Sequence, residues 1–78
     1  MPTVARLAKH RFFFFSNEGH EPPHIHVESG DAYAKFWLEP VTLAHSIGYN
    51  ASELTRLRKL VLDHKERFQE KWHEYFNR

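Results

Sequence analysis

The pattern of apolar and polar positions divides the chain into a strand-rich first half and a helical second half. Short runs rich in β-branched and aromatic residues occur at Thr3–Leu7, His10–Ser16, His24–Glu28 and Ala32–Leu38. Glycine, proline, serine and aspartate residues separate these runs. Runs of this length bounded by turn residues are typical of antiparallel hairpins. We therefore expect a small antiparallel sheet of about four strands over residues 3–38.

After residue 50 the apolar spacing changes to steps of three and four residues. The positions that share this helical face are Leu54, Leu57, Val61, His64, Phe68, Trp72 and Tyr75. Asn50 and Glu53 have the spacing of a capping box, which favours a helix start at this point. The pattern predicts one long helix over residues 51–77. Between sheet and helix lies a connecting segment, residues 39–49, in which Val41–Ile47 suits either a helical turn or a short strand.

Composition narrows the class of protein. The 78 residues suffice for a single α+β domain over residues 1–78, and the 15% aromatic content can supply its core. The chain has no cysteine, which excludes disulfides, thiolate metal ligands and a cysteine nucleophile. No apolar run approaches the ~20 residues of a membrane span, and no secretory signal is recognisable. We expect a cytoplasmic protein that makes no contact with the membrane.

Strand alternation places the polar candidates on one face of the sheet. His24, His26 and Glu28 alternate with Ile25 and Val27, so they point to the opposite side. A two-residue turn within residues 29–31 puts them on the same face as Tyr33, Lys35 and Trp37. The helix is then expected to cover the other face.

The first predicted hairpin adds cations to this polar face. With Ala8-Lys9 as its turn, Arg6 lies opposite Arg11, an arrangement that costs stability unless an acid or an anionic ligand lies between the two guanidinium groups. Arginine binds phosphate through a planar fork, and aromatic rings such as Trp37 can stack on bases. The face therefore suits a phosphate-bearing ligand. Cross-strand salt bridges, for example of Glu18 or Glu28 with these cations, are the equally weighted alternative.

His24-Ile25-His26 is the sharpest local signal in the chain. Its two imidazoles stand on one face about 6.6 Å apart along the strand. They suit structural hydrogen bonding, proton transfer, since imidazole titrates near neutrality, or metal binding with a third ligand from His20, Glu18 or Glu28. We take His24 and His26 as candidate catalytic residues without a metal or other cofactor. The candidate ligand-binding residues are Arg6, Arg11, Glu18, Lys35 and Trp37.

The end of the predicted helix carries an aromatic cluster, Phe68, Trp72, Tyr75 and Phe76. One interpretation is that it completes the core of the monomer. The other is that it packs on a partner, which would make a homodimer through the C-terminal helix.

Several blocks of the sequence resemble a known bacterial family. The matching blocks are Met1–Val4 with Arg6, Arg11–Phe14, Ser16–Gly19, Glu21–Glu28, Ala34–Leu38 with Pro40-Val41, Glu53-Leu54, and Trp72–Glu74 with Phe76. Together they cover nearly the whole chain and resemble the family called domain of unknown function 4160. The resemblance implies a component of a toxin–antitoxin-type module, encoded beside a cognate small protein, with RNA as a possible target.

Three hypotheses about function follow. The first is an RNA-targeting toxin, acting as a small metal-independent ribonuclease in which His24 and His26 transfer protons and Arg6, Arg11 and Lys35 hold phosphate. The second is a non-enzymatic binding or regulatory partner of antitoxin type, for which the net charge of +1 is an argument, since nucleic-acid binders are usually more basic. The third is a histidine-based metal-binding protein.

Overall fold

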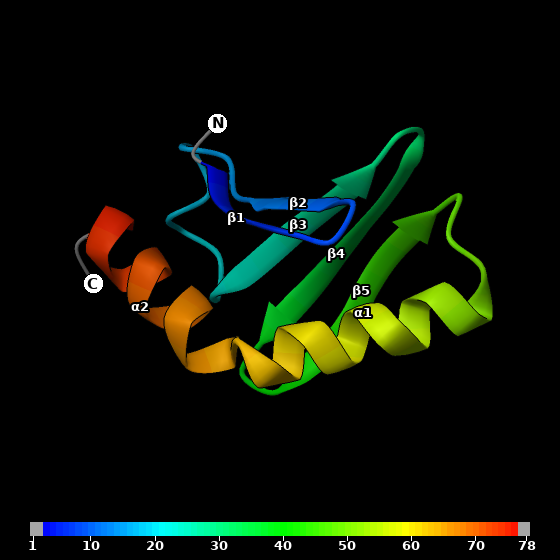
Figure 1. The fold of residues 1–78 in the computed structure, drawn as a ribbon. Coiled ribbons are helices and arrows are strands. Elements are labelled where there is room, and N and C mark those ends of the chain that lie inside the picture. The colour runs from blue at the N-terminus through cyan, green and yellow to red at the C-terminus, as the bar shows by residue number, and fades with distance from the viewer. Residues whose placement is uncertain (1–2, 77–78) are drawn as a thin grey trace.

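A computed structural model describes residues 3–76 as an antiparallel sheet with helices on one face (Figure 1). The strands are β1 (Thr3–Leu7), β2 (His10–Phe13), β3 (His24–Ser29), β4 (Ala32–Leu38) and β5 (Val41–Ile47), and the helices are α1 (Ala51–Asp63) and α2 (Lys65–Phe76). Each strand pairs with the next in chain order, so the sheet is a simple meander. The α+β class is confirmed. The predicted helix end at residue 77 lies outside the described residues.

The sheet contains five strands rather than about four, because the segment after Pro40 is a strand. Pro40 lies in the turn that precedes β5, so its missing N–H removes no hydrogen bond of the ladder. β5 is an edge strand, and most of its side chains are exposed on both faces. This exposure explains why the segment carries no clear alternation of apolar and polar residues.

The predicted long helix is divided in two at His64. The N–H of His64 still bonds to the Leu60 carbonyl, but the residue has left helical geometry, with φ −113° and ψ 14°. Its ring Nδ1 donates to the same carbonyl at 2.9 Å. α1 packs against β4 and β5, whereas α2 packs against β3 and β4. The break therefore lets the two helices follow the sheet across its width (Figure 1).

The core lies between the sheet and these helices. Its buried side chains are Phe12, Phe14, Ile25, Val27, Phe36, Leu38, Leu57, Val61, Phe68 and Trp72, with smaller contributions from Ala34, Val41 and Tyr49. Phe12 stacks on Phe68 with ring centroids 5.3 Å apart, and Phe14 meets Trp72 edge to face at 5.4 Å. Phe12 and Phe14 thus point into the core, and β2 ends at Phe13 rather than at the predicted Ser16.

The register of the strands follows the predicted parity. Arg6 pairs with Arg11, His26 with Lys35, and Glu28 with Tyr33. All of these side chains lie on the face away from the helices. The polar face is therefore a property of β1 to β4 together, and it positions the candidate site.

Candidate functional site

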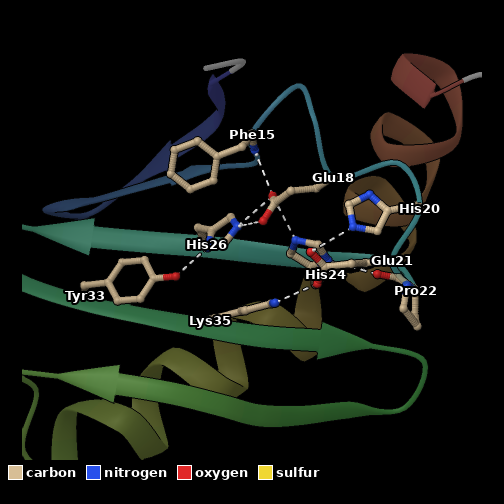
Figure 2. A network of polar contacts seen from close by, with 9 residues as sticks. All are labelled: Phe15, Glu18, His20, Glu21, Pro22, His24, His26, Tyr33 and Lys35. Atoms are coloured by element: carbon tan, nitrogen blue, oxygen red, sulfur yellow. Dashed lines mark hydrogen bonds and ion pairs between the residues drawn. The ribbon is translucent and has the colours of Figure 1, made fainter.

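The two histidines of β3 are buried although they lie on the polar face of the sheet. His24 has no exposed surface and His26 is 3% exposed. The segment of residues 14–23 arches over the start of β3 and covers them (Figure 2). Phe15 stands over the His26 ring at 4.8 Å between centroids, and Trp72 of α2 lies 4.7 Å from the His24 ring. Strand alternation placed both rings on the polar face, and the covering loop makes this part of the face an interior site.

Glu18 joins the two imidazoles (Figure 2). Its Oε1 lies 2.8 Å from Nε2 of His26 and 2.9 Å from Nε2 of His24. The second carboxylate oxygen is 3.0 Å from His26 Nε2, and the backbone N–H of Phe15 donates to Oε1 at 3.0 Å. We call these three residues, Glu18, His24 and His26, the His–Glu cluster. It ties the covering loop to β3.

Nδ1 of each ring, the nitrogen that faces away from Glu18, also makes a hydrogen bond. Nδ1 of His24 donates to the Pro22 carbonyl at 2.9 Å, and Nδ1 of His26 shares a 2.7 Å hydrogen bond with the Tyr33 hydroxyl. Because a carbonyl can only accept, the first bond fixes the proton of a neutral His24 on Nδ1. Its Nε2 then presents a lone pair toward Glu18. The 2.9 Å approach of these atoms has the length of an ion pair, but Nε2 of His24 finds no aligned hydrogen-bond partner among residues 3–76.

The charges in the cluster follow from its burial and its hydrogen bonds. Burial raises the pKa of Glu18, but the neighbouring His24 side chain, the hydrogen bond from the Phe15 backbone and the hydrogen bond from His26 outweigh it, so the net pKa is lowered. Burial lowers the pKa of His26 more than the contact with Glu18 raises it. Near neutral pH the cluster therefore contains an ionised carboxylate against a neutral His26 ring. A lowered pKa on both partners means that the contact is a hydrogen bond to an anion rather than an ion pair.

Two of the three predicted ligand-binding cations, Arg11 and Lys35, flank the cluster, and each is paired with an acid. Arg11 approaches Glu28 at 3.3 Å and lies over the ring of Phe13 at 4.3 Å. Lys35 approaches Glu21 at 2.9 Å and lies over Trp37 at 4.5 Å. Of the cross-strand salt bridges expected as the alternative, that of Glu28 with Arg11 is present, whereas Lys35 pairs with Glu21 of the loop.

Arg6 stands apart from the His–Glu cluster on exposed β1. It pairs across the strands with Arg11, whose guanidinium also donates to the Thr3 hydroxyl at 2.9 Å. Of the seven residues predicted from sequence, the structure brings His24, His26 and Glu18 into direct contact. Arg11, Lys35 and Trp37 lie on the same face around them, and Arg6 lies at its margin.

Among the possible third partners of the histidines, Glu18 takes the position. The side chain of His20 is 76% exposed and its Nε2 lies 4.0 Å from Glu21, away from the cluster. Glu28 is engaged by Arg11. Sequence reasoning gave no role to Tyr33 or Glu21. The strand parity pointed to Tyr33, since it shares the face with His26, whereas the Glu21 contact depends on the path of the loop and has no sequence signal.

Fold and site together define the class of protein: a small α+β domain with a buried His–Glu cluster beneath a loop. The chain matches the family described as domain of unknown function DUF4160 over residues 10–73, and it belongs to that family. The match spans the cluster, β2 to β5 and α1, and most of α2. No curated protein and no solved structure matches the chain significantly. Within residues 3–76, neither helix is long and apolar enough to cross a membrane.

Proposed function

We propose that this protein is the effector of a cytoplasmic toxin–antitoxin-type module and that it acts on RNA at the polar face of its sheet. One observation carries the proposal: groups able to transfer protons lie on the same face as two cations placed over aromatic rings. RNA offers phosphates to the cations and bases to the rings. The family resemblance seen in the sequence supplies the module context.

The salt bridges of Arg11 and Lys35 do not prevent phosphate binding. The carboxylates of both pairs stay partly exposed, Glu28 at 40% and Glu21 at 30%, so a phosphate from solution can replace them as partners of the cations. Arg11 then holds the phosphate through its planar fork and Lys35 as a point charge. Trp37, already beneath Lys35, offers a stacking surface. Arg6 extends this cationic surface along β1.

The His–Glu cluster is the proposed chemical centre. His26 is neutral near pH 7, so its ring can take up a proton, and Glu18 orients it and stabilises the imidazolium that results. Nε2 of His24 lies 2.9 Å from the same carboxylate oxygen, Glu18 Oε1. Because the His26 ring is buried, the substrate reaches it only when the Phe15 side chain over the ring swings aside while Glu18 keeps its contact with His26. This movement is part of the proposal.

Induced expression in a bacterium tests the proposal. We expect growth arrest from the native protein, relief by co-expression of the cognate small protein, and no arrest from the His24→Ala/His26→Ala pair. His20→Ala, at an exposed site of the same loop, and His73→Ala on α2 are matched controls that should arrest growth like the native protein. Arrest by a folded double variant would remove the cluster from the mechanism, and no arrest by the native protein would reject an effector role.

Direct RNA binding tests the cationic face separately. Each phosphate contact contributes about one to the slope of log affinity against log salt concentration. Lys35→Gln and Arg11→Gln should each lower that slope by about one, while Lys59→Gln on α1 should leave it unchanged. A slope near zero for the native protein would contradict RNA as the target.

A second candidate function is a non-enzymatic binding partner of antitoxin type. It is favoured by the burial of both histidines together with the pairing of Arg11 and Lys35 to acids, since this leaves few free groups for catalysis. Its partner is the cognate small protein or, through α2, a second copy of the chain. Size-exclusion chromatography with light scattering, with and without the cognate protein, tests it. A stable complex without any effect on growth would support this function over the first.

A further inference from the structure

The three side chains of the His–Glu cluster converge on one point. One donor atom from each of Glu18, His24 and His26 lies within 4.8 Å of the other two. Two imidazole nitrogens and one carboxylate oxygen form a donor set typical of zinc and neighbouring divalent transition metals. We propose that the cluster binds one such ion, of zinc type, and that this ion fastens the loop of residues 14–23 onto β3.

The buried Nε2 of His24 is the independent observation that points to a ligand. Its ring has no exposed surface, and its Nδ1 is already engaged by the Pro22 carbonyl. Nε2 stands 2.9 Å from Glu18 Oε1, with no hydrogen bond between the two atoms. A buried polar atom without a partner calls for an explanation, and an unplaced ion is one. A cation between the nitrogen and the carboxylate oxygen gives both atoms a partner.

The surroundings of the rings match those of metal-bound histidines. A histidine that binds a metal through one nitrogen usually donates its other N–H to a carbonyl or another acceptor, which fixes the ring. His24 makes that bond to the Pro22 carbonyl, and His26 has the Tyr33 hydroxyl in the same position. Both rings therefore present Nε2 inward. Phe13 stacks on His26 at 5.4 Å and supplies an apolar wall.

The distances agree with a small ion. Zinc bonds to nitrogen and oxygen of about 2.0–2.2 Å in a tetrahedral site place neighbouring donor atoms about 3.3–3.5 Å apart. The two histidine nitrogens lie 2.8 and 2.9 Å from Glu18 Oε1, so each contact must lengthen by only about 0.5 Å on that geometry. Small changes of side-chain torsion achieve this. Calcium and magnesium are disfavoured because they take oxygen ligands almost exclusively.

The inference concerns the same residues as the proposed function but does not depend on it. An ion would make the two Nε2 atoms ligands instead of proton carriers, which changes the chemistry of the centre and leaves the RNA-binding face as it is. The ion can equally serve a protein that only binds a partner. Zinc binding without growth arrest, or growth arrest without zinc binding, separates the two proposals.

The experiment uses the untagged full chain, freed of metal with a chelator and then titrated with zinc chloride by calorimetry. We expect one zinc ion per chain and a rise of the melting temperature, because an ion that binds only the folded state stabilises it. Elemental analysis of protein purified without chelator should also find zinc. Substitution with Co²⁺ should give the visible absorption of a four-coordinate nitrogen and oxygen site.

The variants separate ligands from neighbours. Glu18→Gln, which keeps the side-chain shape, and His24→Ala should each weaken zinc binding at least about 100-fold, and Tyr33→Phe, which removes an outer contact, about 10-fold. His20→Ala, the exposed neighbour, should bind like the native protein. Absence of zinc binding to the native protein, with an intact circular dichroism spectrum, would overturn the inference. Unchanged zinc affinity in folded Glu18→Gln would overturn it as well.

Discussion

At the scale of single residues, the seven histidines share one side chain but differ in their burial and in the contacts they make. His20 is exposed in the loop, while His24, four positions later, is fully buried. Nδ1 of His24 donates to the Pro22 carbonyl, and its Nε2 lies 2.9 Å from Glu18 Oε1. His10 is a third case, half-buried at the start of β2 with its Nδ1 3.1 Å from the Tyr49 hydroxyl. The position of each ring relative to the loop and the helices decides how far it is buried and which contacts it makes.

The environment of His10 leads to a dependence of stability on pH. Burial, followed by the charge of Lys9, lowers the pKa of His10 below 6.5, against the opposing effect of Glu53. The unfolded chain therefore binds the His10 proton more readily than the folded chain, so this contribution to stability is complete above pH 6.5 and decreases as the pH falls below it.

The variant His10→Asn removes the titrating group and keeps a polar atom near Tyr49. Urea unfolding at pH 7.5 and at pH 5.5 should show a larger loss of unfolding free energy for the native protein than for this variant. Equal losses would contradict the lowered pKa.

At the scale of elements, the turns and helix ends carry the most specific signals. The capping box at the start of α1 is complete: the Glu53 N–H donates to Asn50 Oδ1 at 2.8 Å, and the Asn50 N–H donates to Glu53 Oε1 at 3.0 Å. These bonds satisfy two backbone groups that the helix itself leaves free. The sequence pattern was sufficient to find this start, because a capping box is a purely local structure.

Removal of the cap should destabilise the protein measurably. Asn50→Ala is expected to cost about 1 kcal/mol of unfolding free energy, equivalent to a fall of about 4–8 °C in melting temperature for a domain of this size. Asn50→Asp, which keeps the acceptor, is the matched control and should retain most of the stability. Thermal unfolding followed by circular dichroism measures both. An equal loss in the two variants would show that the side-chain bond is unimportant.

Two glycines with positive φ offer a comparison of backbone strain. Gly30 in the β3–β4 turn has φ +58°, and an added Cβ would meet no atom within 4 Å. Gly48 after β5 has φ +86°, and its Cβ would lie 3.1 Å from the Cα of Ala32, a backbone atom that cannot move aside.

Gly30→Ala should therefore cost about 1–2 kcal/mol, the usual penalty of a left-handed residue. Gly48→Ala should cost more, because strain and a steric contact add. Chemical denaturation of both variants tests the order, and a larger cost at Gly30 would show that the contact with Ala32 is relieved easily.

At the scale of the whole molecule, α2 connects the core to the His–Glu cluster. Trp72 is 1% exposed and contacts Phe14 on one side and His24 on the other. Phe68 is fully buried as well, whereas Tyr75 is 48% exposed. The inner half of the aromatic cluster thus completes the monomer core. Tyr75 is its main surface for a partner, and the homodimer stays a prediction.

The core position of Trp72 predicts a severe effect. Replacement of a buried tryptophan by alanine costs about 3–5 kcal/mol, and a domain of this length has roughly 4–12 kcal/mol in total, at 0.05–0.15 kcal/mol per residue. Trp72→Ala should therefore be largely unfolded near 37 °C, whereas Tyr75→Ala should lose less than about 1 kcal/mol as an exposed substitution. Urea titration of both variants gives the comparison. A stable Trp72→Ala protein would show that α2 contributes little to the fold.

The sequence by itself determined the α+β class, the register of β1 with β2, the parity of β3 with β4, the start of α1 and the face on which His24 and His26 lie. These features depend on local patterns among residues close in the chain, namely strand alternation, turn residues and a capping box. Tertiary structure decided that β5 is a strand, that the helix breaks at His64 and that the polar face is closed over its histidines. Each of these depends on segments far apart in sequence, such as the loop that brings Glu18 onto β3 or the sheet that α2 must follow. Periodicity along the chain does not encode such contacts. The residue types therefore suggested His24 and His26 as a site, but only the folded molecule shows that Glu18 is the residue that joins them.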